Sequence, residues 1–147
     1  MLPNLTVVPM REIDTVAGGT AAFGIVDTKG YDYAKLIYAT TKATAASSQD
    51  FFDFGHCDTL ATAYTDTGVT TICTGTTDLT VVAESTSYSN CYVFNVNLVG
   101  RKRYLAMRYE SDATHHGSML AILGRKEDGN EATVATTAHG TRNIASY

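Results

Sequence analysis

Apolar side chains recur at every second position along several short segments of this chain, and this period constrains the fold more than any other feature. The clearest example is the run 91–99, in which Tyr92, Phe94, Val96 and Leu98 alternate with other residues. A period of two is typical of a strand with one buried face, whereas a helix needs apolar residues three and four positions apart. No helix of ordinary length can be drawn anywhere in the sequence. The pattern therefore predicts an all-β protein.

Further strands are predicted between clusters of turn-forming residues, at 23–26, 31–40, 51–57, 104–109 and 118–123. Asp27 and Gly30 favour a tight turn, and we expect 91–99 and 104–109 to pair as antiparallel strands joined at Gly100. Residues 64–72 resemble a hairpin, while 79–83 fit either a strand or a single helical turn. About seven to nine short strands separated by turns predict a β-sandwich that is similar to a jelly roll.

The length of 147 residues, of which 44% are hydrophobic, fits one domain with its own core. We expect residues 1–20 to form an extended N-terminal arm, because Pro9 breaks its β-prone start and the polar stretch that follows has no period. Residues 21–125 are expected to form the sandwich. Residues 126–147, charged at first and then rich in Thr and Ala, are expected to be a C-terminal tail that packs on the domain or on a partner.

Charge and composition exclude several classes of partner. The formal net charge of −4 gives no overall positive field to hold nucleic acid or anionic lipid. No apolar stretch approaches the roughly 18 to 20 residues needed to cross a bilayer, and the first residues do not resemble a signal peptide. The three cysteines, Cys57, Cys73 and Cys91, are odd in number and widely scattered, which indicates reduced thiols. We expect a soluble protein that is made in the cytoplasm of its producer.

The tripeptide Asp66-Thr67-Gly68 is the sharpest enzymatic signal. It resembles the catalytic motif of aspartic proteases, and Ile122-Leu123-Gly124-Arg125 is similar to a second motif of the retroviral enzymes. The resemblance implies a dimeric protease that uses Asp66. However, Thr65 and Val69 depart from the family pattern, and the same tripeptide is ordinary turn chemistry. The prediction is a protein without catalytic residues, with this protease as the alternative.

Metal and cofactor sites are not predicted either. His115 and His116 are adjacent, so on a strand they would point to opposite faces, and no Cys-x-x-Cys or His-x-x-x-His spacing preorganises ligands. We expect this pair in a solvated loop. No phosphate-binding or dinucleotide-binding glycine motif is present, so the prediction includes no cofactor and no small-molecule substrate.

Three segments carry a resemblance that extends over most of the chain. Residues 27–35, 98–105 and 121–125 resemble small virion proteins of tailed phages and prophages that are taken to be head decoration, or cement, proteins. Residues 51–58 depart from the Ser-x-Asp-Gly stretch of many such chains. The resemblance implies a β-sandwich that binds the major capsid protein, assembles as a homotrimer and lies on the exterior of the capsid. A tail, fibre or baseplate β module is the structural alternative.

The candidate contact residues lie in two places. The first set is apolar and belongs to the N-terminal arm, where the segment could add a strand to a neighbour's exposed sheet edge or could be an edge strand of its own sheet. The second set is the only basic concentration, which could meet an acidic partner or form a solvated tip. The first set is Leu5, Val7, Val8 and Met10, and the second is Arg101, Lys102 and Arg103.

Overall fold

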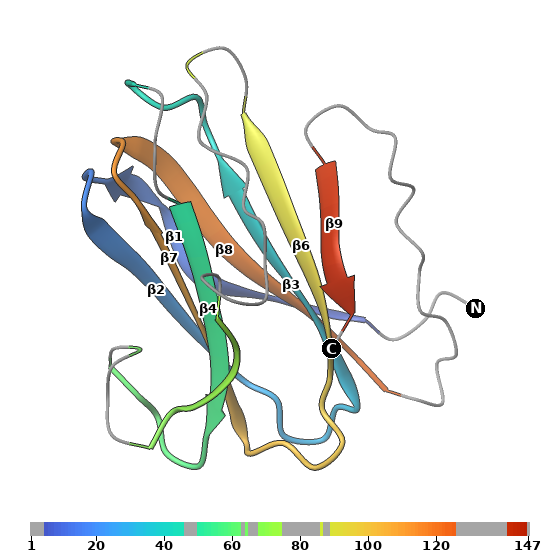
Figure 1. Cartoon of the computed structure of the whole chain (residues 1–147). Coiled ribbons are helices and arrows are strands. Elements are labelled where there is room, and N and C mark those ends of the chain that lie inside the picture. The colour runs from blue at the N-terminus through green and yellow to red at the C-terminus, as the bar shows by residue number, and fades with distance from the viewer. Residues whose placement is uncertain are drawn as a thin grey trace.

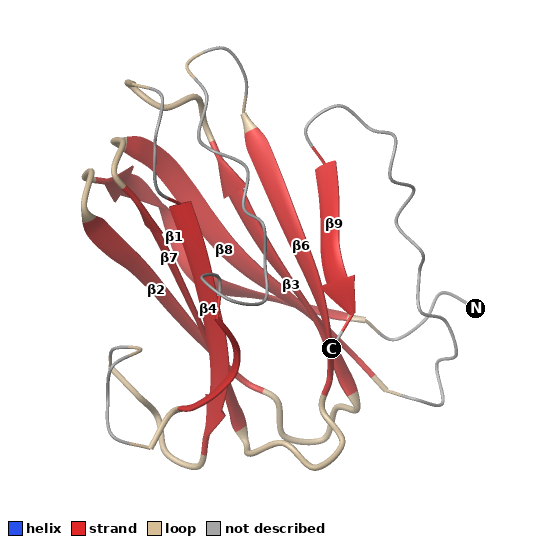
Figure 2. Cartoon of the chain, in the orientation of Figure 1, coloured by secondary structure: helices blue, strands red, loops and turns tan. Residues whose placement is uncertain are grey.

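The computed structural model describes residues 5–45, 50–62, 64, 68–74, 86, 89–125 and 141–146, with the backbone alone at 50, 51, 74 and 141–146. These residues form strands joined by loops and include no helix (Figure 2), which confirms the all-β prediction. The described part of the chain accordingly contains no helix long and apolar enough to span a membrane. The strands in chain order are β1 (Thr6–Val16), β2 (Thr20–Asp27), β3 (Tyr33–Thr40), β4 (Asp50–Cys57), β5 (Thr70–Thr74), β6 (Asn90–Asn97), β7 (Tyr104–Ser111), β8 (His115–Gly124) and β9 (Thr141–Ser146).

The strands form two sheets that pack face to face as a sandwich (Figure 1). One sheet has the order β1-β8-β3-β6-β9 and the other the order β2-β7-β4-β5. The antiparallel pairs β1·β8, β2·β7, β3·β6 and β4·β5 are those of one long hairpin rolled up on itself, which is the topology of a jelly roll. Strand β9 is added in parallel beside β6. The predicted sandwich of jelly-roll type is therefore confirmed.

Aromatic side chains from the inner faces of both sheets fill the core. The predicted alternation in β6 is confirmed, because Tyr92, Phe94 and Val96 are all buried. Phe52 of β4 lies at the centre of the aromatic cluster. Its ring centroid is 4.6 Å from that of Tyr109, and it also packs on Tyr92, Phe94 and Tyr38 at 4.8, 5.0 and 5.7 Å. Rings at such distances stabilise a core beyond simple area burial.

The expected pairing of 91–99 with 104–109 is wrong. Both segments are strands, but β6 belongs to the five-stranded sheet and β7 to the four-stranded sheet. Both long edges of each strand are already occupied, those of β6 by β3 and β9 and those of β7 by β2 and β4. The connection 98–103 therefore crosses from one sheet to the other instead of closing a hairpin.

The hairpin expected within 64–72 also differs from the structure. Strand β5 begins at Thr70 and pairs with β4, so the hairpin is formed by β4 and β5. Gly68 lies in the loop between them with a φ of 111°. Asp66, Thr67 and the segment 79–83 lie outside the described residues.

Both ends of the described chain join the five-stranded sheet. Residues Thr6–Val16 pair with β8, so of the two alternatives for the N-terminal segment the structure shows an edge strand of the chain's own sheet. The polar stretch after Met10 is held by backbone pairing despite its lack of an apolar period, and the register shifts between Pro9 and Arg11 and between Arg11 and Asp14. Part of the predicted tail forms β9, while 126–140 and 147 lie outside the described residues.

Candidate interaction surfaces

Three loops and the end of β8 form one end of the sandwich, which we call the loop end. It comprises residues 28–32, 58–60 and 98–103 together with Arg125, and it lies at the bottom of Figure 1. Backbone hydrogen bonds connect its parts. The N–H of Thr28 donates to the carbonyl of Arg103 at 2.9 Å, and the N–H of Leu98 donates to the carbonyl of Asp32 at 2.9 Å. These bonds fix the loops 28–32 and 98–103 to one another as a preorganised surface.

The connection 98–103 presents an apolar side chain at its tip. The N–H of Arg101 donates to the carbonyl of Leu98 at 2.9 Å, which closes a β-turn. Gly100 occupies the third position of this turn with a φ of 76°, a conformation that type II turns require and that glycine adopts without strain. Val99 at the second position is 71% exposed. The turn therefore holds a valine side chain in solvent on a fixed backbone.

The three predicted basic residues of this connection have different surroundings. Lys102 Nζ lies 3.3 Å from Asp58 Oδ2, and Arg103 binds Asp27 with two nitrogens, the shorter contact being 2.6 Å. The hydrogen bond from Arg103 is the largest cause that lowers the pKa of the Asp27 carboxyl. Arg101 is exposed and has no ion-pair partner within the part of the chain that the structure describes. Of the three, Arg101 is the one whose charge is available to a partner.

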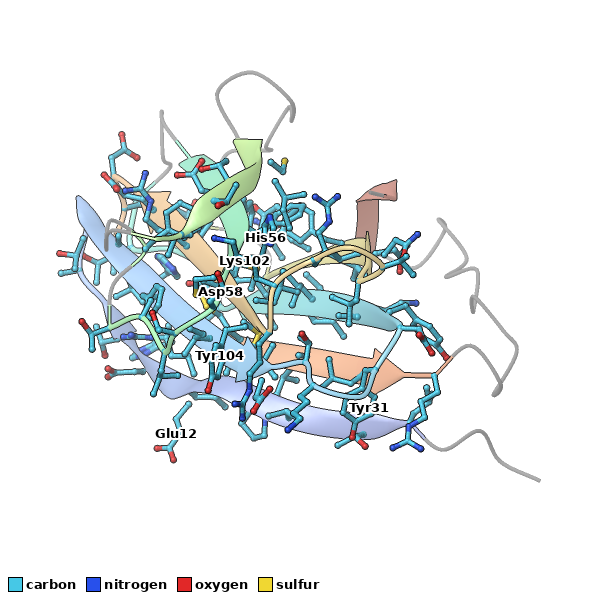
Figure 3. The ribbon with its side chains drawn as sticks, turned by 90° about the horizontal axis from the view of Figure 1, so that it is seen from below. Glu12, Tyr31, His56, Asp58, Lys102 and Tyr104 are labelled. Atoms are coloured by element: carbon cyan, nitrogen blue, oxygen red, sulfur yellow. The ribbon has the colours of Figure 1, made fainter. Side chains whose placement is uncertain are left out.

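His56 at the end of β4 fixes the backbone of the same connection. The N–H of Lys102 donates to His56 Nδ1 at 2.8 Å, and Figure 3 shows Lys102 close to both His56 and Asp58. Burial is the largest cause that lowers the pKa of the imidazole, followed by the positive charges of Arg101 and Lys102, while Asp58 acts in the opposite direction. A neutral ring is required, because a protonated Nδ1 cannot accept a hydrogen bond.

Acidification is therefore expected to loosen the 98–103 connection. Because the pKa of His56 is lower in the folded protein than the ordinary 6.5, the contribution of this bond is complete above pH 6.5 and is lost as the pH falls from there through the folded-state value. Below the folded-state pKa, amide hydrogen exchange followed by NMR should show about fivefold less protection of the Lys102 N–H than above pH 6.5. This is the loss expected for a hydrogen bond worth about 1 kcal/mol. In His56→Gln, whose side-chain oxygen accepts without titrating, protection should not change with pH. Equal pH dependence in both proteins would contradict this role.

The predicted apolar contact residues of the N-terminal segment fall on two faces of β1. Leu5, just before the strand, and Val7 are 45% and 60% exposed, whereas Val8 and Met10 are half-buried and pack against the core. The side chains of Val8 and Met10 therefore hold β1 on the sandwich. Sequence reasoning missed Ile13, which is 78% exposed in the same strand.

The exposed side of β1 continues into an apolar strip on the outer face of the five-stranded sheet. Val7 lies opposite Ile122 of β8, and Leu120 of β8 lies opposite Ile37 of β3. Strand β8 alternates from His115 to Leu123, so that Met119, Ala121 and Leu123 are buried in the core while Leu120 and Ile122 are half-buried on the other face. An antiparallel sheet with one solvated face normally carries polar residues there. We call Val7, Ile37, Leu120 and Ile122 the apolar strip.

The two adjacent histidines belong to a strand, and the first of them is hydrogen-bonded in the core. The solvated loop expected for His115 and His116 is wrong, because both belong to β8, with His115 buried and His116 exposed. Tyr38 Oη lies 2.7 Å from His115 Nε2, and His115 Nδ1 lies 3.0 Å from the carbonyl of Ala113. No group of three or more His, Cys, Asp or Glu that could hold a metal occurs among the described residues. Asp66 lies outside them.

The buried carboxylate of Asp53 belongs to a pair on the outer face of the four-stranded sheet. Arg108 of β7 lies opposite Asp53 and donates to its Oδ2 from two nitrogens, at 2.7 and 3.1 Å. The Tyr64 ring lies 5.6 Å from the Arg108 guanidinium, and burial raises the pKa of its phenol to about 12. The pair therefore holds Tyr64 of the β4–β5 loop against the sheet, which is a structural role.

Comparisons with known proteins find distant structural likeness alone. No family model and no curated protein matches the chain. Among solved structures it is similar to a chain of the infectious bursal disease virus Gx strain, with a TM-score of 0.49 and 8% identity over 87% of this chain and 33% of that chain. It thus spans about a third of the viral chain.

Two further solved structures show weaker likeness. One is a Bacillus endospore appendage of a family of disulfide-linked pili, with a TM-score of 0.38 and 15% identity over 85% of this chain and 93% of that one. The other is the Yersinia pseudotuberculosis-derived mitogen, with a TM-score of 0.35 and 14% identity over 92% and 97%. At these levels the likeness supports no inference about this chain.

Proposed function

We propose that this chain is a capsid decoration protein of a tailed phage, which binds the outer surface of the major capsid protein lattice and stabilises the head. The observation that carries the proposal is the apolar strip on the outer face of the five-stranded sheet, next to the exposed Leu5. Contiguous apolar surface on the outer face of a sheet is typical of a protein interaction site. The resemblance of three segments to phage decoration proteins supports the major capsid protein as the proposed partner.

The physical mechanism requires attachment and no catalysis. A protein that binds the assembled lattice better than the free capsid subunits stabilises the shell by mass action. Many copies on one shell multiply a modest contact energy. A rigid sandwich suits this task, because Val7 and Ile122 are fixed by β1·β8 pairing and lose little freedom when they dock.

Strand β1 also provides a second kind of contact. It is the last strand on its side of the five-stranded sheet, so one of its edges faces away from β8. An unpaired edge can accept an extended segment of a partner through main-chain hydrogen bonds. Pro9 removes one of the donors in this strand. We therefore assign most of the affinity to the apolar strip and little to strand addition.

Charge introduced into the apolar strip is expected to prevent attachment. We expect Val7→Asp to bind heads that lack this protein at least about tenfold more weakly, because docking would bury an unpaired carboxylate. Leu60→Asp is the matched control, since Leu60 is also an exposed apolar residue but lies in the β4–β5 loop of the other sheet. Co-sedimentation of the full-length chain with the heads gives both affinities. Equal weakening by the two variants, or by neither, would contradict the proposed surface.

A count of copies separates the head from the tail alternative. A decoration protein is expected in numbers that match the capsid lattice, whereas a tail, fibre or baseplate module is present in a few copies per particle. Quantitative mass spectrometry of purified particles, referenced to the major capsid protein, measures this ratio. A ratio far below that of the lattice would contradict a place on the head.

A further inference from the structure

Two of the most exposed apolar side chains in the structure lie near charged residues, one near a carboxylate and the other near a guanidinium. Ile13 of β1 is 78% exposed and follows Glu12, while Val99 at the loop end is 71% exposed and lies two residues before Arg101. Neither Glu12 nor Arg101 has an ion-pair partner within the described ranges. One patch of the surface thus has an apolar residue beside a carboxylate, namely Ile13 and Glu12. A second patch has an apolar residue beside a guanidinium, namely Val99 and Arg101.

The irregular half of β1 presents the first of these patches. Arg11 pairs in register with Met119 and Asp14 with Gly117, so three steps along β1 match two along β8 and the strand bulges between them. Such a bulge redirects side chains. Arg11 and Asp14 form an ion pair at 3.2 Å across the bulge. In Figure 3 the Glu12 side chain extends away from the ribbon into open space.

The loop end presents the second patch on a preorganised backbone. The type II turn fixes Val99, and the hydrogen bond from Lys102 to His56 holds the adjoining residue. Cations outnumber carboxylates here, although the chain as a whole has a net charge of −4. The cations are Lys29, Arg101, Lys102, Arg103 and Arg125, and the carboxylates are Asp32 and Asp58, together with Asp27 at the adjoining end of β2. This end of the molecule therefore attracts acidic surface.

We propose that Glu12 and Ile13 of one copy dock onto Arg101 and Val99 of a second copy of this chain. The two patches are different surfaces of one chain, so each copy uses one patch toward its predecessor and the other toward its successor. Repetition of such a head-to-tail contact closes a ring or extends a filament. The apolar pair would provide contact area, and the ion pair would provide orientation and specificity. This inference is independent of the proposed binding to a capsid, because it concerns the chain alone in solution.

Charge reversal tests this pairing through the assembly state of the full-length chain. Sedimentation equilibrium over a concentration series should show assemblies larger than one chain for the natural protein. Glu12→Arg and Arg101→Glu should each weaken assembly by about tenfold or more, because each places like charges opposite one another. An equimolar mixture of the two variants should form open chains or even-numbered rings in which the variants alternate, because the arginine introduced in one variant then faces the glutamate introduced in the other, and the next junction has the natural pair. The double variant should also assemble.

Lys29→Glu is the matched control, since it reverses an exposed cation of the same loop end that lies in another loop. It should change the association constant by no more than about twofold. A monomeric natural protein at every concentration would overturn the proposal, as would single reversals without effect. Failure of the double variant to assemble would overturn it as well, and binding of each variant to heads then remains a separate test of the capsid surface.

Discussion

Replacement of Phe52 by alanine is expected to lower the free energy of unfolding by about 3–5 kcal/mol, the largest effect of any single change considered for this chain. Phe52 is fully buried and packs on aromatic rings from both sheets, namely Tyr38 and Tyr92 on one side and Tyr109 on the other. Truncation would remove the contact between the layers and leave a cavity that rigid strands cannot fill. Urea unfolding followed by circular dichroism measures the loss.

Phe23→Ala is the matched control for this prediction. Phe23 of β2 is half-buried and alternates with the buried Ala22 and Gly24, so its side chain lies on the other face of the strand, outside the core cluster. Its truncation should cost about 1–2 kcal/mol, in proportion to the smaller apolar area that returns to water. Losses of similar size at both positions would contradict a core organised around Phe52.

Replacement of Gly117 by alanine is expected to lower the free energy of unfolding by about 3 kcal/mol, the upper part of the usual range for overpacking. A Cβ at this position would collide with the ring and hydroxyl of Tyr38. The ring cannot move aside easily, because it is fully buried and its hydroxyl is hydrogen-bonded to His115 at 2.7 Å. Thermal and urea unfolding should both report the loss.

The neighbouring residue supplies the control for Gly117. Ser118 lies on the opposite face of β8 and is half-buried, so Ser118→Ala should change stability by less than about 0.5 kcal/mol. In a Tyr38→Leu background the clash is relieved, and Gly117→Ala should then cost less than about 1 kcal/mol. An unchanged cost in that background would show that Tyr38 is not what excludes a side chain at position 117.

The sequence predicts which residues face the core better than it predicts which strands pair. Alternation in 91–99 and 118–123 is visible without a structure because one face of each strand is buried. It does not identify the neighbour in the sheet, since any two alternating strands present similar faces to a core. In a jelly roll β6 pairs with β3 and β7 with β2, which are distant in the sequence, so the assumption that consecutive strands pair was wrong.

The same alternation predicts part of the candidate surfaces, but it fails where a strand is irregular and says nothing about ion pairs. Alternation alone separates Val7 from Val8, but the bulge near Arg11 interrupts it, and Ile13 could not be assigned to a face from sequence. The basic residues 101–103 look equivalent in sequence. Only the fold shows that Asp27 and Asp58 neutralise Arg103 and Lys102, because these carboxylates reach the connection from β2 and from the loop after β4.

A reconstruction of purified particles by electron cryomicroscopy tests the central claim most directly, because it shows which face of the sandwich meets another protein. We predict that the chain lies on the outside of the head with Val7, Leu120 and Ile122 against the major capsid protein. The four-stranded sheet should face away from the shell. A chain found on the tail, or one on the head whose apolar strip faces solvent, would contradict the account.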